Sequence, residues 1–591
     1  MQDHTVEWAI LSLFKRGLMR TNKIFERFDI YMLMSKLIGQ RFKEAPTEAN
    51  IISHNFLLRG AYIRQVAGGI YSLLTPAKKI AQNIENILRI EMRELDGQEV
   101  KFPLVTPREL FEESNRYEVD ALEIVTFRDR NKRNFSLGTS HEEAAIHLAR
   151  TEATTYTDYP FSLYQIQTKF RDEPHTRGAL VRLREFTTKD AYSFHATEES
   201  LEEYYNLCRL TYKNIFRHIG LPTVYVEAEN GQEFMSLCEA GESEVATCKC
   251  GYCANIHVAK GTIRKPEHQE QKSLSKTYTP DLRTIDDLAN FLKIESNRCL
   301  KATVFEKEGS SKPVIVFIRG DLEVNEDKLR VLCEGNIYPL VSYGENDSLT
   351  FGFIGPIGLD DSKYDIFYDF SLEGINNLVC GANEEDYHTE GVCLSRDLPN
   401  ITYVDLATVT DDFVCSKCNE NNLILTKGIK VGTISKLGTK HTSAMNMLYI
   451  DSEGNRQNPF MGYYAIGIER VIAALIESNH DDNGPIWPQE IAPWQIHICA
   501  INLKDDAIKE TANSLYSQLR SAGYEVLMDD RQVSAGNQFA DADLLGIPVR
   551  ITVSPRNLKS GCYEVSTRDK RLSEMIGKDD IENALKRIIV A

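Results

Sequence analysis

The clearest periodic pattern in the chain predicts a helix over residues 198–219. Apolar side chains recur there at intervals of three and four residues, which places them on one helical face: Leu201, Tyr204, Tyr205, Cys208, Tyr212, Ile215, Phe216 and Ile219. Thr197 can cap the first turn, and Gly220 followed by Pro222 ends the helix. We expect this apolar face to be part of a core and not a ligand site.

Two strands are expected before this helix. Residues 162–170 alternate between apolar and polar positions, and residues 185–194 do so less regularly. The intervening segment DEPHTRGALVR contains proline and glycine, which are typical of a loop. The pattern predicts an antiparallel pair with a long connection.

The pattern changes after residue 495, where predicted strands and helices alternate. Strands are expected in QIHICAIN, YEVLMDD and PVRITVS, and helices in 507–519, NQFADADLLG and 579–590. Such alternation is typical of a small α/β domain.

Three changes in composition suggest domain boundaries. Residues 1–31 precede the patterned sequence and look like an appendage. The polar, lysine-rich stretch 257–283 is typical of a linker, and prolines interrupt the pattern near 486–495. At roughly 150 residues per domain, the length suggests about four domains.

Composition narrows the class of protein. The chain is 42% hydrophobic and 26% charged, as expected of globular domains. Its 13 cysteines are odd in number and scattered, which favours reduced thiols in the cytoplasm over a disulfide framework. No stretch reaches the roughly 20 apolar residues of a membrane span. The net charge of −18 repels nucleic acid at long range, so contact with RNA needs local basic patches.

The stretch FRDEPHTRGALVRLREFTTKDAYSFH (170–195) carries four arginines close to the predicted strand pair: Arg171, Arg177, Arg182 and Arg184. A planar guanidinium can hold phosphate oxygens through two parallel hydrogen bonds. Spacing alone leaves two interpretations open, a phosphate-binding site or surface arginines paired with neighbouring acidic residues.

This stretch resembles motif 2 of class II aminoacyl-tRNA synthetases, in the form found in bacterial prolyl-tRNA synthetases. EVKFPLVTPRELFEES (99–114) is similar to motif 1, and GYYAIGIERVIAALIE (462–477) is similar to motif 3. The resemblance extends over about residues 32–591. It implies a class II antiparallel-sheet catalytic core of mixed α+β and α/β architecture, with the domains 32–256, 257–414 (an inserted α/β editing domain), 415–490 (the core continued) and 491–591 (a C-terminal α/β anticodon-binding domain).

The resemblance also implies the activity. A proline–tRNA ligase would activate L-proline with ATP and Mg²⁺ and transfer it to tRNA(Pro), as a cytoplasmic homodimer whose interface includes motif 1, with no DNA or membrane partner. Two other functions stay open: a synthetase-like, non-catalytic tRNA-binding or regulatory protein, and a ligase of altered amino-acid specificity.

Roles for individual residues follow from the same resemblance. Arg171 would hold the α-phosphate of ATP and the carboxylate of proline, Glu173 would contact the adenylate, and Arg470 would hold the γ-phosphate. Phe186 would stack on adenine. The rest of the implied ATP-binding set is Arg184 and Thr439.

The stretch GTSHEEA resembles the family's Thr-His-Glu loop, with Ser140, His141 and Glu142 in those places. A buried carboxylate is the natural partner of proline's cationic amine, which is the implied role of Glu142. Arg171 and His195 would complete the pocket; the alternative for His195 is a core histidine.

Three departures from the family pattern motivate the altered-specificity alternative. Ser140 replaces threonine, Ala465 replaces the first glycine of a Gly-Ile-Gly sequence, and a loop bordering the amino-acid pocket is shortened to 231–234.

Within the insertion, Lys301 and His388 match the family's editing lysine and histidine, and GFIGP, from Gly352 to Pro356, matches its substrate loop. Editing of Ala-tRNA(Pro) is needed because a pocket rejects a smaller amino acid by only ~1–3 kcal/mol per missing methylene. The alternative is a lysine and a histidine on an ordinary surface.

Two Cys-x-x-Cys pairs, Cys250/Cys253 and Cys415/Cys418, flank the insertion. Two such pairs are the usual ligands of a structural zinc ion. Cys248 competes with Cys253, because its spacing to Cys250 also fits, and unliganded thiols are the alternative.

Near the C-terminus, the stretch LMDDRQVSAGNQFADADLLGIPVRI resembles the anticodon-binding domain of class IIa synthetases. Asp529, Asp530 and Arg531 are then candidate readers of guanine edges in a proline anticodon. A polar strand end without such a role is the alternative.

Overall fold

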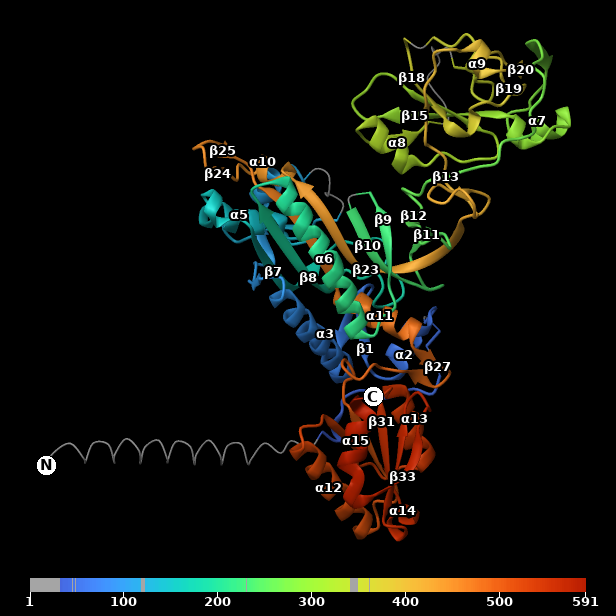
Figure 1. The fold of residues 1–591 in the computed structure, drawn as a ribbon. Helices are drawn as coiled ribbons and strands as arrows, with labels where there is room; N and C mark the ends of the chain where they lie inside the picture. The colour runs from blue at the N-terminus through green and yellow to red at the C-terminus, as the bar shows by residue number, and fades with distance from the viewer. Residues whose placement is uncertain are drawn as a thin grey trace. The chain divides into compact units, whose positions relative to one another are not determined.

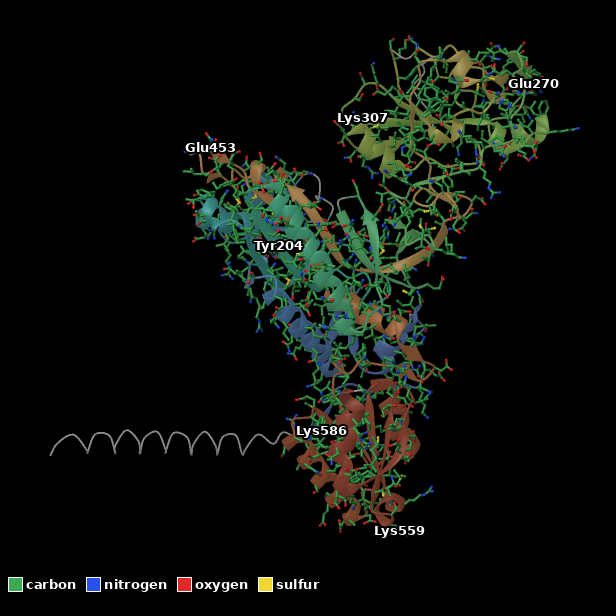
Figure 2. The ribbon with its side chains drawn as sticks, viewed as in Figure 1. Tyr204, Glu270, Lys307, Glu453, Lys559 and Lys586 are labelled. Atoms are coloured by element: carbon green, nitrogen blue, oxygen red, sulfur yellow. The ribbon has the colours of Figure 1, made fainter. Side chains whose placement is uncertain are left out.

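A computed structural model describes residues 32–590 except 45, 48, 118–122, 230, 341–348 and 361. The predicted appendage 1–31 lies outside the described residues. The chain divides into two compact units, Thr223–Leu437 and the remainder on either side of it. Figure 1 traces the chain from blue to red, and Figure 2 adds the side chains.

The larger unit is built on antiparallel strands, as predicted. β7 (Phe161–Phe170) and β8 (Glu185–His195) pair from Phe161↔Phe194 to Phe170↔Glu185. β26 (Phe460–Gly467) pairs antiparallel with the other edge of β8, and the short β3 (Gly97–Glu99) pairs parallel with β7. Motif 2 and motif 3 are therefore neighbouring strands of one sheet.

Helix α6 (Glu198–Ile219) confirms the helix predicted from the apolar period. The Thr197 side chain accepts a hydrogen bond from the Ser200 N–H, and Gly220 ends the helix with a φ of 78°. Its apolar face is buried and contacts α3 (Thr75–Arg93), β8 and β26. The other helices of this part are α2 (Ile52–Arg59), α4 (Arg108–Glu113), α5 (Glu142–Glu152), α10 (Lys440–Ala444) and α11 (Ile468–Ser478).

The C-terminal part of the larger unit is a five-stranded mixed sheet in the order β30-β29-β31-β32-β33. The predicted strands are β29 (Ile496–Ala500), β30 (Val526–Asp529) and β31 (Val549–Val553), and the predicted helices are α12 (Asp506–Ser521), α13 (Ala535–Leu545) and α15 (Ile581–Val590). An antiparallel hairpin of β32 (Cys562–Thr567) and β33 (Ser573–Gly577), preceded by the short α14 (Pro555–Lys559), was not predicted.

The first described residues pack on this C-terminal sheet. The Met528 N–H donates to the Met32 carbonyl over 3.1 Å, and the Met32 N–H donates to the Tyr516 hydroxyl over 2.8 Å. Met34 is buried in an apolar cluster with Trp494, Leu527, Leu545 and Ile547. The segment that begins at Met32 is thus held by main-chain bonds and by apolar burial.

The smaller unit contains a five-stranded sheet in the order β17-β15-β16-β18-β21 and a three-stranded sheet in the order β14-β20-β19. The bounds are β15 (Leu300–Lys307), β16 (Val314–Arg319), β17 (Ile337–Pro339), β18 (Asp365–Asp369), β21 (Tyr403–Val404), β14 (Ser275–Tyr278), β19 (Leu378–Gly381), β20 (Tyr387–Val392), α7 (Ile285–Leu292), α8 (Glu326–Cys333) and α9 (Leu394–Asp397). Its other strands are β9 (Val224–Ala228), β10 (Gly231–Leu237), β11 (Ser243–Thr247), β12 (Cys253–Asn255), β13 (Gly261–Thr262), β22 (Val414–Cys415) and β23 (Ile424–Gly438).

The stretch 257–283 is packed, in contrast to the predicted linker. β13 pairs with β22 and β14 pairs with β20. Between these strands, Arg319 Nη1 donates to the Arg264 carbonyl over 2.8 Å, and Asn377 Nδ2 donates to the Glu270 carbonyl over 2.8 Å. Most side chains of this stretch are exposed, with Thr279 as a buried exception, while its main chain is held by the folded unit.

Candidate functional site

Strand register brings the signature residues of motifs 2 and 3 to one end of the sheet. Arg171 directly follows the last residue of β7, and Phe186 is the second residue of β8, opposite Lys169. Gly467, the last residue of β26, pairs with Thr188, so α11 and its first-turn residue Arg470 begin beside Phe186.

Arg171 lies over the aromatic ring that was predicted to hold adenine. Its guanidinium carbon is 5.5 Å from the centroid of Phe186, and Nε and Nη2 both donate to the Thr139 carbonyl over 3.3 Å. The side chain stays 39% exposed. The guanidinium is therefore oriented by the protein but still accessible to an anion.

Helix α11 is tied to the same strand end. Glu469 accepts a hydrogen bond from the Thr187 N–H over 2.8 Å, and burial raises the pKa of Glu469 to about 7. A cavity of about 120 Å³ opens here, and its lining includes Tyr71, Thr168, Phe186 and Glu469. This cavity offers an aromatic face and polar groups next to the Arg171 guanidinium.

The other motif 2 groups form a local ionic network. Arg182 Nε lies 2.8 Å from Glu173 Oε2, and Arg184 Nε donates to the Glu173 carbonyl over 2.9 Å. Burial acts to raise the pKa of Glu173, but the hydrogen bonds from Arg182 and the His175 N–H, together with the charges of those two residues, bring the pKa below its ordinary value. The interpretation as a surface arginine paired with a neighbouring acid therefore fits Arg182. It does not fit Arg171 in the same way, because Arg171 Nε lies 4.0 Å from Glu123 Oε2.

The predicted proline-binding acid is buried and ionised. Glu142 opens α5, is 6% exposed, and its Oε2 lies 2.8 Å from Arg116 Nη1. Burial opposes ionisation, yet Arg116, Lys169 and the Ser140 hydroxyl lower the pKa of Glu142 to about 2. The same Arg116 nitrogen lies 3.1 Å from Glu143, so one cation serves two adjacent carboxylates.

Ser140, His141 and Glu142 connect to Arg171 through Thr139, whose carbonyl Arg171 holds. The His141 N–H donates to the Tyr192 hydroxyl over 2.9 Å. Burial lowers the pKa of His141 to about 4, so the ring is neutral near pH 7. The segment 140–142 is therefore directly joined in sequence to the residue that orients Arg171.

His195 and Thr439 lie at the other end of the strands. His195 is the last residue of β8 and pairs with Phe460, and its Nδ1 lies 2.9 Å from the Ser200 hydroxyl of α6. Burial lowers the pKa of His195 to about 4. Thr439 precedes α10, and its carbonyl accepts from the Ser443 N–H. The structure does not bring either residue beside Phe186, and their predicted binding roles stay predictions.

The predicted editing residues border a cavity of about 760 Å³ in the smaller unit. Lys301, Gly352 and His388 line it, and Lys301 Nζ lies 2.7 Å from Glu323 Oε1. The Thr279 hydroxyl lies 2.7 Å from His388 Nδ1, and burial lowers the pKa of His388 to about 4.

The loop 352–356, the predicted substrate loop, is held at its main chain by the Asn383 side chain. The Gly355 N–H donates to Asn383 Oδ1 and the Gly355 carbonyl accepts from Asn383 Nδ2, both over 2.9 Å. A Cβ at Gly355 would lie 1.8 Å from the Gly381 carbonyl oxygen, so only glycine fits. Pro356 follows as a buried residue of the same loop and is outside the described cavity lining.

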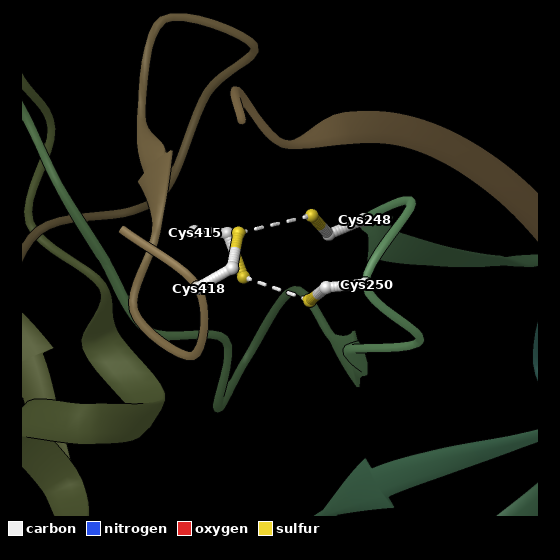
Figure 3. A group of neighbouring side chains, drawn as sticks. All are labelled: Cys248, Cys250, Cys415 and Cys418. Carbon is white, nitrogen blue, oxygen red and sulfur yellow. Dashed lines mark hydrogen bonds between the residues drawn. The ribbon is translucent and has the colours of Figure 1, made fainter. Parts of the chain in front are cut away.

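Four cysteines converge in the smaller unit, as Figure 3 shows: Cys248, Cys250, Cys415 and Cys418. Their Sγ atoms lie within 4.8 Å of one another, and the Cys248–Cys418 and Cys250–Cys415 separations are both 3.7 Å. An edge of a tetrahedral zinc–thiolate site, with Zn–S near 2.3 Å, is about 3.8 Å. The donor set and its spacing fit zinc.

The group contains Cys248, the alternative left open by the sequence, in place of Cys253. Gly251, with a φ of 86°, reverses the chain after Cys250, and Cys253 then enters β12 opposite Thr247. There it packs against an apolar cluster that includes Val226 and Val245. Cys248 takes its place because Cys248 and Cys250 both precede the turn at Gly251 and lie close to Cys415 and Cys418.

The predicted anticodon residues bond to their own fold. Asp529 is buried, and its carboxylate accepts from Arg531 Nε over 2.9 Å and from Nη2 over 2.6 Å. Arg531 Nη1 also lies 2.7 Å from Asp541. The Asp530 carboxylate accepts from the N–H and the hydroxyl of Ser35 over 2.9 and 2.6 Å.

Sequence reasoning missed two side chains that act on these sites. Arg116 pairs with Glu142, and Asn383 fixes the loop of the larger cavity. No sequence motif around Arg116 or Asn383 indicates its role, because each contacts a partner that is distant in sequence.

Among the described residues, no helix has both the length and the apolar composition needed to span a membrane.

Comparison with known proteins agrees with this geometry. The family described as "tRNA synthetase class II core domain (G, H, P, S and T)" matches residues 118–479, and "Anticodon binding domain" matches residues 495–588. The chain is 41% identical to the proline–tRNA ligase of Caldicellulosiruptor saccharolyticus over 94% of this chain and 98% of that protein. It is 39% identical to that of Bacillus licheniformis over the same shares.

A solved structure agrees in fold. The prolyl-tRNA synthetase from Cryptosporidium parvum, complexed with halofuginone and AMPPNP, superposes with a TM-score of 0.54 at 13% identity, covering 91% of this chain and 77% of that one. Together with the sequence relatives, these matches show that the chain belongs to the proline–tRNA ligase family of class II aminoacyl-tRNA synthetases.

Proposed function

We propose that Arg171, Phe186 and the first turn of α11 form the site at which ATP and proline become prolyl-adenylate. The observation that carries the proposal is the shared strand end, where Arg171 lies 5.5 Å from Phe186 and Glu469 is bonded to Thr187. An aromatic face and an oriented, accessible guanidinium suit a nucleotide base and its phosphates. Arg470, Glu173 and Arg184 complete the proposed ATP-binding set at this strand end. Thr439, at the other end of the strands, stays a predicted member of that set.

In the proposed reaction, the proline carboxylate attacks the α-phosphorus in line, a P–O bond forms, and the bond to the leaving diphosphate breaks. Negative charge grows on the phosphate oxygens, where Arg171 and Arg470 would stabilise it without reorganising. Mg²⁺ would enter with ATP and neutralise phosphate charge.

Glu142 is the proposed partner of the cationic proline amine. It is buried, and Arg116 and Lys169 keep it ionised. A buried carboxylate binds a cation more strongly than an exposed one, since water does not compete. Ser140, His141 and His195 are the other proposed pocket residues.

The cavity around Lys301 and His388 is the proposed site for hydrolysis of Ala-tRNA(Pro). It holds a lysine that can contact RNA or the ester and a histidine kept neutral by burial. Gly352 and Pro356 would shape its substrate loop. The proposed editing domain is 257–414, inserted between the core segments 32–256 and 415–490.

We propose that Cys248, Cys250, Cys415 and Cys418 hold a structural zinc ion. It would link the two chain segments that lead into and out of the insertion. Four thiolates close the coordination sphere, so no position remains for a catalytic water.

In the domain 491–591, Asp529, Asp530 and Arg531 are the proposed anticodon contacts. Because Asp529 is buried, we expect it to orient Arg531, which would meet the base edges itself. We also propose a cytoplasmic C2 homodimer. A mainly apolar cavity of about 520 Å³ is lined by motif 1 and α5, where Val105 is 41% and Leu148 is 38% exposed.

Amino-acid-dependent ATP–diphosphate exchange tests the proposal. A panel including proline and alanine should give exchange with proline preferred. Exchange with no preference for proline would favour a ligase of altered specificity, and no exchange would favour a non-catalytic tRNA-binding protein.

A further inference from the structure

A second cavity, of about 390 Å³, lies in the larger unit between residues 41–59 and α13. Its lining is cationic: Arg41, Lys43, Arg59 and Arg531. Among the described residues that line it, Asp541 is the single acid. A cationic cavity is unexpected in a chain whose net charge is −18.

The positive charge of this cavity is not balanced by its own contacts. Asp541 is already paired with Arg531 at 2.7 Å, and Arg531 is also paired with Asp529. Within the described ranges, Arg59 donates to neutral oxygens, on Phe42 and Asn55. No contact of Lys43 offsets its charge among the described residues.

Arg41 is the least satisfied of these cations. Its Nε is buried without a hydrogen-bond partner among the described residues. Burial and the neighbouring Arg531 lower the pKa of Arg41, although Asp541 acts against them. A partly buried cation without an ion pair is costly, so an anionic ligand would offset that cost.

The segment that carries Arg41 is fixed against the C-terminal domain. Ser35 makes two hydrogen bonds to Asp530, and Met32 and Met528 share a main-chain bond. The cavity is therefore built from two anchored segments. Its rim also carries the amides Asn483 and Asn537.

We propose that this cavity binds a backbone phosphate of the bound tRNA, next to the proposed anticodon contacts. Arg531 belongs both to the proposed anticodon contacts and to the lining of the cavity. A planar guanidinium such as that of Arg41 suits a phosphodiester, whose two free oxygens accept parallel hydrogen bonds. The inference rests on the proposed anticodon role of the domain 491–591.

Salt dependence of tRNA(Pro) binding tests the proposal. Removing one cation that binds a phosphate should reduce the slope of log affinity against log salt by about one. Arg41→Gln and Lys43→Gln should each flatten the slope in this way and weaken binding roughly tenfold, for cognate and non-cognate tRNA alike. Lys559→Gln, an exposed cation of the same domain outside the cavity, is the matched control and should keep the wild-type slope.

Proline-dependent ATP–diphosphate exchange, which needs no tRNA, reports whether each variant is folded. If Arg41→Gln loses ATP–diphosphate exchange activity, the salt dependence of Lys43→Gln decides between the outcomes. Lys43 is exposed, so its replacement does not disturb the packing. Wild-type slopes in the folded variants would overturn the proposal. So would thermal stabilisation of the wild type by inorganic phosphate with unchanged tRNA slopes, which indicates a site for a free anion. Failure of the wild-type enzyme to bind tRNA(Pro) would instead refute the proposed anticodon role.

Discussion

Replacing Glu142 with glutamine tests the proposed proline pocket. Glu142 is 6% exposed, and its carboxylate lies 2.8 Å from Arg116 Nη1. A hydrogen bond to a charged group contributes about 1.5–3 kcal/mol, so loss of the charge should raise the KM for proline roughly ten- to a hundredfold. The KM for ATP should change little, since Arg171 and Phe186 stay in place.

The neighbouring Glu143 supplies a matched control. It pairs with the same Arg116 nitrogen at 3.1 Å but also accepts from the Ser114 hydroxyl over 2.8 Å, on the side of α4. Glu143→Gln removes the same charge one residue away and should leave the KM for proline near the wild-type value. Equal effects of the two substitutions on proline and on ATP would show that Glu142 acts on the fold and not on the amino acid.

The pH dependence sharpens this test. The folded pKa of Glu142 is lowered from 4.5 to about 2. A lowered carboxyl pKa stabilises the folded state above the unfolded value, and that contribution is lost as pH falls from about 4.5 towards 2. Proline affinity measured between pH 5 and 8 should therefore show no acid limb from Glu142. A limb near pH 5 that disappears in Glu142→Gln would contradict the ionic environment derived for this residue.

Three further predictions concern the other sites. Arg171→Ala should lower the rate of ATP–diphosphate exchange by about 10²–10³, as expected for loss of a preorganised hydrogen-bond donor. The melting temperature should change little, because the side chain is 39% exposed. A loss of activity below tenfold would refute its role at the α-phosphate. Cys248→Ser should release zinc from the purified protein whereas Cys253→Ser should retain it, and elemental analysis that finds the reverse would refute the ligand set. Lys301→Ala should slow hydrolysis of Ala-tRNA(Pro) in a deacylation assay while proline activation persists; unchanged deacylation would place editing elsewhere.

Helices and strands could be predicted from the sequence where the local patterns all indicated the same element. The helix 198–219 has an unbroken apolar period, a capping threonine and a terminating glycine, and all three agree with α6. The strands and helices after residue 495 were likewise marked by their alternation. The residues of the candidate active site came from motif resemblance, and strand pairing then placed Arg171, Phe186 and Arg470 at one end.

The remaining features depend on contacts that sequence does not display. Both Cys248 and Cys253 satisfy plausible ligand spacing, and only the turn at Gly251 decides between them. The polar stretch 257–283 suggested a linker because side-chain polarity carries no information about where main-chain carbonyls find donors. Asp529 was predicted as a reader of guanine edges, but its carboxylate is buried and accepts hydrogen bonds from Arg531.

The pairing of β13 with β22 places Gly261 directly opposite Cys415. The intervening chain therefore begins and ends at adjacent positions of neighbouring strands. The rest of the fold does not have to span a gap to accommodate it. Because its two ends adjoin, this intervening chain can vary in length at little loop-closure cost to the rest of the fold.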